Sequence, residues 1–145
     1  MSCIFCEIAA GRIPAKLAYA DEHVVAFHDV SPQAPTHVLV IPRVHLPDLD
    51  AATPTHIPTL GHLLWVAREL AGTLGLAGGY RLVVNRGPDG GQSVNHLHVH
   101  LLGGRAMQWP PGWGGRRVGV PAGVRPDRGR RPIVEPPVIL TGPRP

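Results

Sequence analysis

The spacing of apolar residues predicts two helices. Ile4, Phe5 and Ile8 recur at helical intervals and Gly11 follows them, which indicates a short amphipathic helix over residues 3–10. A longer helix is predicted from Pro58 onward and ends before Gly78-Gly79. Its apolar positions recur at steps of three and four residues: Leu60, Leu63, Leu64, Ala67, Leu70 and Leu74.

Five further segments have the apolar composition or alternation of β-strands. They are residues 16–20, 23–29, 37–42, 80–85 and 96–102. Asp21-Glu22 forms a tight connection between the first two, which indicates a β-hairpin, and such short connections favour antiparallel pairing. We therefore expect an α+β fold: a five-stranded antiparallel sheet with the short and the long helix on one face.

The last predicted strand has a histidine at every second position: His96, His98 and His100. Alternate residues of a strand face opposite sides, so the aliphatic residues between the histidines would enter the core and the imidazoles would share the other face. Three imidazoles this close cannot all be protonated without repulsion, so at least one is expected to be neutral. Two other interpretations stay open, namely structural histidines and a catalytic metal site with His-x-His ligands.

A glycine-rich turn precedes these histidines. Gly90 and Gly91 allow backbone N–H groups to approach an anion closely, and Ser93 adds a hydroxyl. The segment therefore predicts a nucleophile, a phosphate site and proton donors within a dozen residues.

The charge of the chain is unevenly distributed. The 145 residues are one domain's worth, and the net charge is +4. Residues 114–145 contain seven arginines against Asp127 and Glu135, together with seven prolines and six glycines. This composition predicts a disordered tail at 114–145 after a folded domain at 1–113. Because no aromatic residue accompanies the arginines, we expect no specific nucleic-acid partner.

Features of membrane and secreted proteins are missing from the sequence. No apolar run approaches the length of a membrane span, and the N-terminus lacks the basic start and apolar stretch of a signal peptide. We expect no membrane partner and a cytoplasmic location. Cys3 and Cys6 fit a reducing compartment, where this spacing more often indicates metal or redox chemistry than a structural disulfide.

Residues 96–102 match the signature His-φ-His-φ-His-φ-φ, where φ is apolar, and residues 3–113 resemble the histidine-triad (HIT) family. Within that family, PAKLAYADEHVVAFHDVSPQAPTHVLVIPRVH and GGQSVNHLHVHLLGGRAMQWPPG resemble the Hint branch, the purine nucleoside phosphoramidases. The resemblance implies a HIT-like fold, a homodimer, and hydrolysis of the P–N bond in AMP or GMP conjugates without a cofactor for catalysis.

The same resemblance implies roles for individual residues. His98 would be the nucleophile and carry the nucleotidyl intermediate, while His100 would contact the phosphate and the leaving group. His37 would orient the triad, His96 would complete it, and Ser93 would bind phosphate oxygens. The implied nucleotide-binding residues are Ile4, Phe5, Ile8, Phe27, Asp29, Val30, Leu39, Asn85, Gly91, Gln92, Ser93, His100 and Trp109.

Some HIT proteins that begin with C-x-x-C carry a structural zinc, and the resemblance implies Cys3, Cys6, His45 and His96 as its ligands. Two thiolates and two imidazoles form a closed tetrahedral set, as structural zinc prefers. Such a site would join the first helix to the histidine strand and take His96 out of the reaction. The alternative interpretation is two reduced thiols and a surface histidine.

Two departures from the Hint pattern leave the leaving group open. Asn95 stands where the branch usually has an aromatic residue, and Gln108 replaces a frequent histidine. Two rival functions also remain. One is dinucleoside polyphosphate hydrolysis or nucleotidyl transfer on the same fold, against which the WPPG ending argues. The other is a nucleotide-binding scaffold dimer whose catalysis is incidental.

Overall fold

The order of elements is the predicted one, helix, three strands, helix and two strands, with three short helical turns added. The computed structural model describes residues 3–112, and the chain divides into two units, residues 1–107 and 108–145. The predicted domain boundary after Trp113 and the predicted disordered tail lie outside the described residues. The elements are α1 (Ile4–Ala9), β1 (Leu17–Ala20), β2 (Val24–His28), β3 (Thr36–Pro42), η1 (Leu49–Ala51), η2 (Pro54–His56), α2 (Ile57–Thr73), β4 (Tyr80–Val83), α3 (Gly87–Gly90) and β5 (Val99–Gly103).

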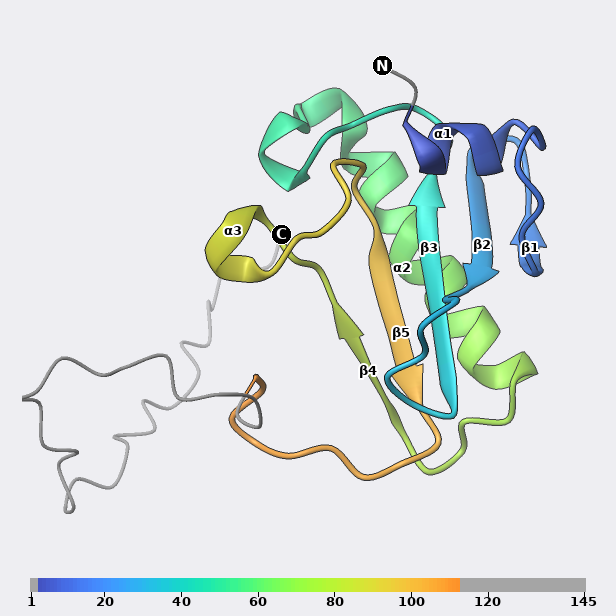
Figure 1. The fold of residues 1–145 in the computed structure, drawn as a ribbon, viewed down its shortest axis with the longest axis vertical. Coiled ribbons are helices and arrows are strands. Elements are labelled where there is room, and N and C mark those ends of the chain that lie inside the picture. The colour runs from blue at the N-terminus through green and yellow to red at the C-terminus, as the bar shows by residue number, and fades with distance from the viewer. Residues whose placement is uncertain (1–2, 113–145) are drawn as a thin grey trace, which may run out of the picture. The chain divides into compact units, whose positions relative to one another are not determined.

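The five strands form one sheet in the order β1-β2-β3-β5-β4, and every neighbouring pair is antiparallel (Figure 1). The α+β fold with a five-stranded antiparallel sheet is therefore confirmed. The register places Leu39 of β3 opposite Phe27 of β2 on one side and opposite His100 of β5 on the other. Cross-strand partners face the same side of a sheet, so these three side chains lie in one row.

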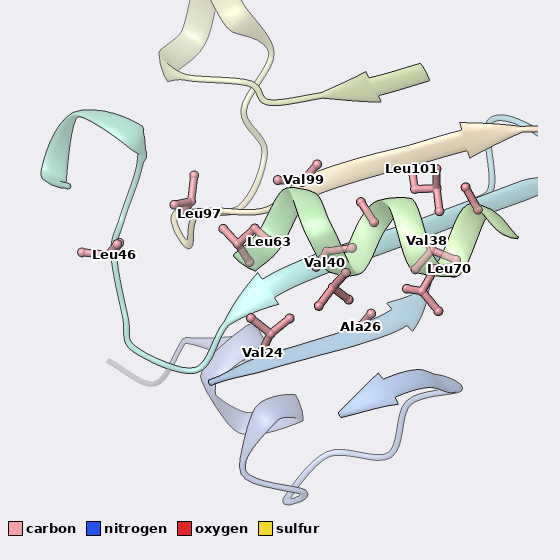
Figure 2. Close-up of a cluster of buried hydrophobic side chains, with 13 residues drawn as sticks. Val24, Ala26, Val38, Val40, Leu46, Leu63, Leu70, Leu97, Val99 and Leu101 are labelled. Atoms are coloured by element: carbon pink, nitrogen blue, oxygen red, sulfur yellow. The ribbon is translucent and has the colours of Figure 1, made fainter. Parts of the chain in front are cut away.

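The main core lies between the sheet and α2 (Figure 2). Leu63 and Leu70 of α2 meet the side chains of Val38, Val40 and their neighbours on the sheet. The buried residues of this cluster are Val24, Ala26, Val38, Val40, Leu46, Leu63, Val66, Ala67, Leu70, Ala71, Leu97, Val99 and Leu101. None of the described helices has the length and apolar content needed to span a membrane.

The short helix α1 packs on the opposite side of the sheet, near the start of β2 and the end of β3 (Figure 1). Phe5 of α1 forms a second buried cluster with Val25, Phe27, Leu39 and Ile41. The prediction that both helices share one face is therefore wrong. The physical reason is that β2 and β3 are apolar at successive positions, so each strand has two faces to cover rather than one.

The histidine strand starts later than predicted, since β5 begins at Val99. The ladder between β3 and β5 ends at the pair of Val40 with Val99. Beyond it Pro42 has no N–H to donate, and the N–H of Leu97 donates instead to the carbonyl of Leu46. The alternation nevertheless persists through residues 96–98, because Leu97 and Val99 are buried in the core against α2.

Candidate active site and metal centre

The face of the sheet that α2 leaves uncovered holds a cavity of about 570 Å³, which is within the range of small-ligand sites. Ten of the predicted site residues line it: Ile4, Phe5, Ile8, Phe27, Asp29, Val30, Leu39, Ser93, His98 and His100. Six further residues that the sequence did not identify complete the lining: Ile13, Pro14, Ala15, Lys16, His28 and Val94. Most of the lining residues are therefore apolar. The polar ones are Lys16, His28, Asp29, Ser93, His98 and His100.

The hydrogen bond of His98 determines which of its ring nitrogens can react. Its Nδ1 lies 2.6 Å from the carbonyl oxygen of His96, which can only accept, so Nδ1 carries the proton. In the neutral ring Nε2 therefore keeps its lone pair. The ring itself is buried, and the edge-to-face contact with Phe5, at 5.2 Å between centroids and 86° between planes, holds its orientation.

His37 and His100 have the opposite arrangement. The backbone N–H of Gln33 donates to Nδ1 of His37 at 3.0 Å, so a neutral His37 carries its proton on Nε2. That Nε2–H donates to Nδ1 of His100 at 2.9 Å, which leaves the proton of a neutral His100 on Nε2. The Nε2 of His100 is buried and has no hydrogen-bond partner among the described residues. Of these two triad histidines, a neutral His98 therefore offers an unprotonated Nε2, and His100 offers an N–H donor that has no partner among the described residues.

The segment Gly103-Gly104-Arg105 holds the loop that orients His37. A Cβ atom on Gly104, whose φ is +89°, would lie 2.9 Å from the ring of Pro35, so this close approach requires glycine. The guanidinium of Arg105 then donates to the carbonyl of Gln33 from Nε at 3.1 Å and Nη2 at 3.0 Å. The N–H of the same Gln33 determines which nitrogen of His37 carries the proton. Arg105 therefore positions His37 indirectly, by holding the backbone of Gln33.

Burial keeps His37 and His100 neutral. It lowers the pKa of His100 to about 4, with the neighbouring His98 and His37 lowering it further and Asp29 opposing them. Burial also lowers the pKa of His37, again against the carboxylate of Asp29, whose Oδ2 lies 3.5 Å from Nε2. Both residues are therefore neutral near pH 7, as the assignment of their protons requires.

The depressed pKa of His100 predicts a loss of stability in acid. The unfolded chain binds a proton near the ordinary value of 6.5 and the folded chain only near 4, so the free energy of unfolding falls as the pH drops between these values. At about 1.4 kcal/mol per pKa unit, His100 contributes at most about 3 kcal/mol to this fall. Urea denaturation from pH 7 to pH 4.5 should give a shallower dependence for His100→Gln than for wild type. Parallel curves would contradict the prediction.

Several predicted nucleotide-binding residues lie outside the cavity lining. The side chain of Gln92 accepts from the N–H of Gly87 at 3.1 Å and donates to the carbonyls of Pro47 and Val94 at 2.8 and 3.0 Å. Its amide thus holds the turn around α3 rather than facing the cavity. Asn85 and Gly91 flank the same turn, and Trp109 belongs to the second unit, so their predicted roles stay predictions.

The predicted zinc ligands lie together at the start of α1, and their donor atoms are within 4.8 Å of one another. Nδ1 of His96 is 3.4 Å from Sγ of Cys3, 3.5 Å from Sγ of Cys6 and 3.2 Å from Nδ1 of His45. With Zn–N bonds of about 2.0 Å and Zn–S bonds of about 2.3 Å, neighbouring donors of a tetrahedral site lie about 3.3 to 3.8 Å apart. Nε2 of His96 donates to the carbonyl of Pro42 at 2.8 Å, so Nδ1 offers its lone pair. The residues present therefore fit a structural zinc.

A second group of potential metal ligands is Asp29, His37 and His100. Here the two imidazole nitrogens that would face an ion, Nε2 of His37 and Nδ1 of His100, are joined by their own hydrogen bond at 2.9 Å. His96 faces the thiols and not this group. The geometry therefore favours the Cys3, Cys6, His45 and His96 cluster over this group as the metal centre.

A family model described as the HIT domain matches residues 10–107. The chain belongs to the HIT family. Over 111 residues this HIT protein is 55% identical to the "14 kDa zinc-binding protein" of Zea mays, an alignment that covers 75% of this chain and 87% of the relative. The name of that relative agrees with the Cys/His cluster described above.

Two solved structures extend the comparison. A HIT family hydrolase from Legionella pneumophila superposes with a TM-score of 0.75 at 47% identity, covering 77% of this chain and 100% of that chain. A histidine triad protein from Clostridium difficile superposes with a TM-score of 0.72 at 40% identity, covering 74% of this chain and 95% of that chain. The fold of this HIT protein and the predicted family are thus confirmed together.

Proposed function

We propose that the protein hydrolyses the P–N bond of purine nucleoside 5′-monophosphoramidates, the reaction of the Hint branch that its sequence resembles. The observation that carries the proposal is that two imidazoles of the cavity, those of His98 and His100, carry their protons on different ring nitrogens. Nε2 of His98 has a free lone pair because Nδ1 donates to a carbonyl, and Nε2–H of His100 is a buried donor without a partner among the described residues. A neutral nucleophile beside an N–H donor suits attack on a phosphoryl centre.

The reaction then has two displacements at phosphorus. Nε2 of His98 forms a bond to phosphorus as the bond from phosphorus to the amine nitrogen breaks, and the amine leaves with a proton taken from solvent. Water next attacks the same phosphorus and gives up a proton to solvent, the bond to His98 breaks and returns its electron pair to Nε2, and the nucleoside monophosphate is released. Nε2–H of His100 and the hydroxyl of Ser93, which also lines the cavity, hold the negative phosphate oxygens.

The remainder of the cavity fits a purine nucleoside. Phe5 and Phe27 meet edge to face at 5.3 Å, and with Ile4, Ile8 and Leu39 they form apolar walls for a planar base. In this proposal the carboxylate of Asp29, which follows β2 and lines the cavity, accepts hydrogen bonds from the two ribose hydroxyls.

A comparison of leaving groups tests the proposal against its rivals. Full-length protein would be supplied with AMP joined to a primary amine through a P–N bond and, separately, with diadenosine tetraphosphate. We expect a much larger kcat/KM for the phosphoramidate, with AMP as the nucleotide product. Preference for the dinucleotide would favour the polyphosphate hydrolase function, and AMP binding without turnover of either compound would favour the scaffold function.

A homodimer is part of the same proposal. Leu64 and Trp65 of α2 are 50% and 55% exposed, and Leu64, predicted to face the core, instead points to solvent. β4 is a sheet edge, and Tyr80 and Val84 at its ends are 44% and 40% exposed. Large exposed apolar side chains beside the edge strand of a sheet are typical of an interface with another chain.

We expect Trp65→Glu to shift the protein from dimer to monomer, because a carboxylate at a buried interface has no partner and is costly to desolvate. Sedimentation equilibrium at micromolar concentration measures this. Leu17→Glu, on β1 at the opposite edge of the sheet, is the matched control and should leave the mass unchanged. A monomeric wild type, or a Trp65→Glu variant that stays dimeric, would contradict the proposed interface.

A cytoplasmic location completes the proposal. Cys3 and Cys6 are not joined by a disulfide, and a site that needs two thiolates for a metal requires a reducing compartment. Fractionation of cells that express the full chain would test this location.

A further inference from the structure

Helix α1 belongs to two sites at once. Cys3, at its N-cap, and Cys6, one turn later, face His45 and His96, while Ile4, Phe5 and Ile8 line the nucleotide cavity. The helix has six residues and no side-chain hydrogen bond at its N-cap. Because a helix this short is not stable by itself in water, its position depends on what it contacts on these two sides.

Phe5 is the residue through which α1 reaches the nucleophile. It is 6% exposed and directly precedes the metal ligand Cys6. Its ring meets His98 edge to face at 5.2 Å, Phe27 at 5.3 Å and His96 at 6.0 Å. A displacement of Cys6 would therefore move the side chain that both orients His98 and closes one wall of the base slot.

The histidine end of the cluster reaches the same nucleophile through the backbone. His96 is fully buried, its Nδ1 faces the thiols, and its carbonyl accepts the 2.6 Å hydrogen bond from Nδ1 of His98. The N–H of Leu97, between them, is bonded at 2.6 Å to the carbonyl of Leu46, the residue after His45. The metal cluster and the reactive imidazole thus share two rigid connections, one through Phe5 and one through residues 96–98.

We propose that zinc at the Cys3, Cys6, His45 and His96 site and a nucleotide in the cavity bind cooperatively, with α1 as the coupling element and Phe5 as its positioning residue. The inference rests on the nucleotide site proposed above. Whichever ligand binds first orders α1, so the second ligand no longer loses free energy in ordering it. Linkage requires the same factor in both directions, and couplings of this kind are typically on the order of tenfold.

Two binding measurements on the full-length protein test the coupling. Calorimetry gives the Kd of AMP for zinc-loaded and for chelator-stripped protein, and competition with a chromogenic chelator gives the Kd of zinc with and without saturating AMP. We expect zinc to lower the Kd of AMP, and AMP to lower the Kd of zinc, each by about tenfold. Linkage requires the two factors to be equal, so their agreement checks the two measurements against each other. Independent sites would give a factor of one in both.

The variant Phe5→Leu distinguishes coupling through α1 from an indirect effect in which each ligand only stabilises the folded state. The variant keeps all four metal ligands and an apolar side chain but loses the ring that contacts His98. We expect it to bind one zinc per chain while both coupling factors fall toward one. If stripped protein unfolds, AMP would favour zinc retention merely by binding the folded state, and that effect would persist in Phe5→Leu. Persistence would therefore overturn the proposal.

The remaining outcomes are also decisive. AMP binding that is equally tight with and without zinc, and zinc affinity that AMP does not change, would overturn the coupling and leave the proposed hydrolase intact. AMP binding to neither form would overturn the nucleotide site and the coupling together.

Discussion

His98→Ala is expected to lower kcat for the phosphoramidate by on the order of 10⁴-fold or more, because the variant has no nitrogen to attack phosphorus. AMP binding should persist, since Asp29, Ser93 and the apolar walls are unchanged. Single-turnover kinetics and calorimetry measure the two effects. His23→Ala, an exposed histidine in the turn between β1 and β2, is the matched control and should retain the activity of the wild type.

The covalent intermediate gives an independent test of the same residue. Acid quenching during turnover, followed by proteolysis and mass spectrometry, should place an AMP adduct on the peptide that contains His98 and on no peptide of His98→Ala. An adduct on His96 or His100 would contradict the assignment, as would a variant that retains activity within tenfold of wild type.

The distinction among the three histidines could not be made from their spacing. All three alternate with aliphatic residues, and only the resemblance to the HIT family assigned them different roles. The structure shows that the three rings have different partners: the carbonyl of Pro42 for His96, the carbonyl of His96 for His98, and His37 for His100. These partners lie far along the chain or on the backbone, where a sequence pattern carries no signal.

The fold could be predicted better than the roles of the histidines, because the spacing of apolar residues indicates which side of a helix or strand is buried. Leu63, Ala67 and Leu70 recur as predicted and are buried on α2. The errors arise where tertiary contacts decide. Leu64 is exposed although its spacing fits the core face, and β5 starts at Val99 because Pro42 has no N–H to extend the ladder beyond the pair of Val40 with Val99. Such effects depend on neighbours that are remote in sequence.

The cavity shows the same limit of prediction. The resemblance supplied Phe27, Asp29 and Leu39, which the register of β2, β3 and β5 brings beside His100. It did not supply Lys16 or Ile13, which line the cavity from the loop after α1. Nor could it show that the amide of Gln92 is satisfied by the backbone of Gly87 and Val94 in its own loop and by the carbonyl of Pro47, 45 residues away.

Removal of zinc is expected to lower the melting temperature strongly. The site joins α1 to residues 45 and 96, and a metal that binds only the folded chain stabilises it by about 4 kcal/mol when its free concentration is a thousand times its Kd. For a domain of this size that corresponds to a loss of about 10 to 20 °C in the chelator-stripped protein. The double variant Cys3→Ser, Cys6→Ser should melt in the same lower range and still turn over substrate slowly, because His98, His100 and Ser93 are retained.

Metal analysis of protein purified without chelators decides whether this stabilisation comes from zinc. Wild type should contain close to one zinc per chain and the double cysteine variant almost none. His45 provides a sharper comparison, because its imidazole is exposed and contributes little to packing. His45→Ala should lose zinc and melt lower, whereas His23→Ala, an equally exposed histidine outside the cluster, should keep both its zinc and its melting temperature. A metal-free wild type with unchanged stability, or equal behaviour of the two histidine variants, would show that the cluster consists of two reduced thiols beside ordinary histidines.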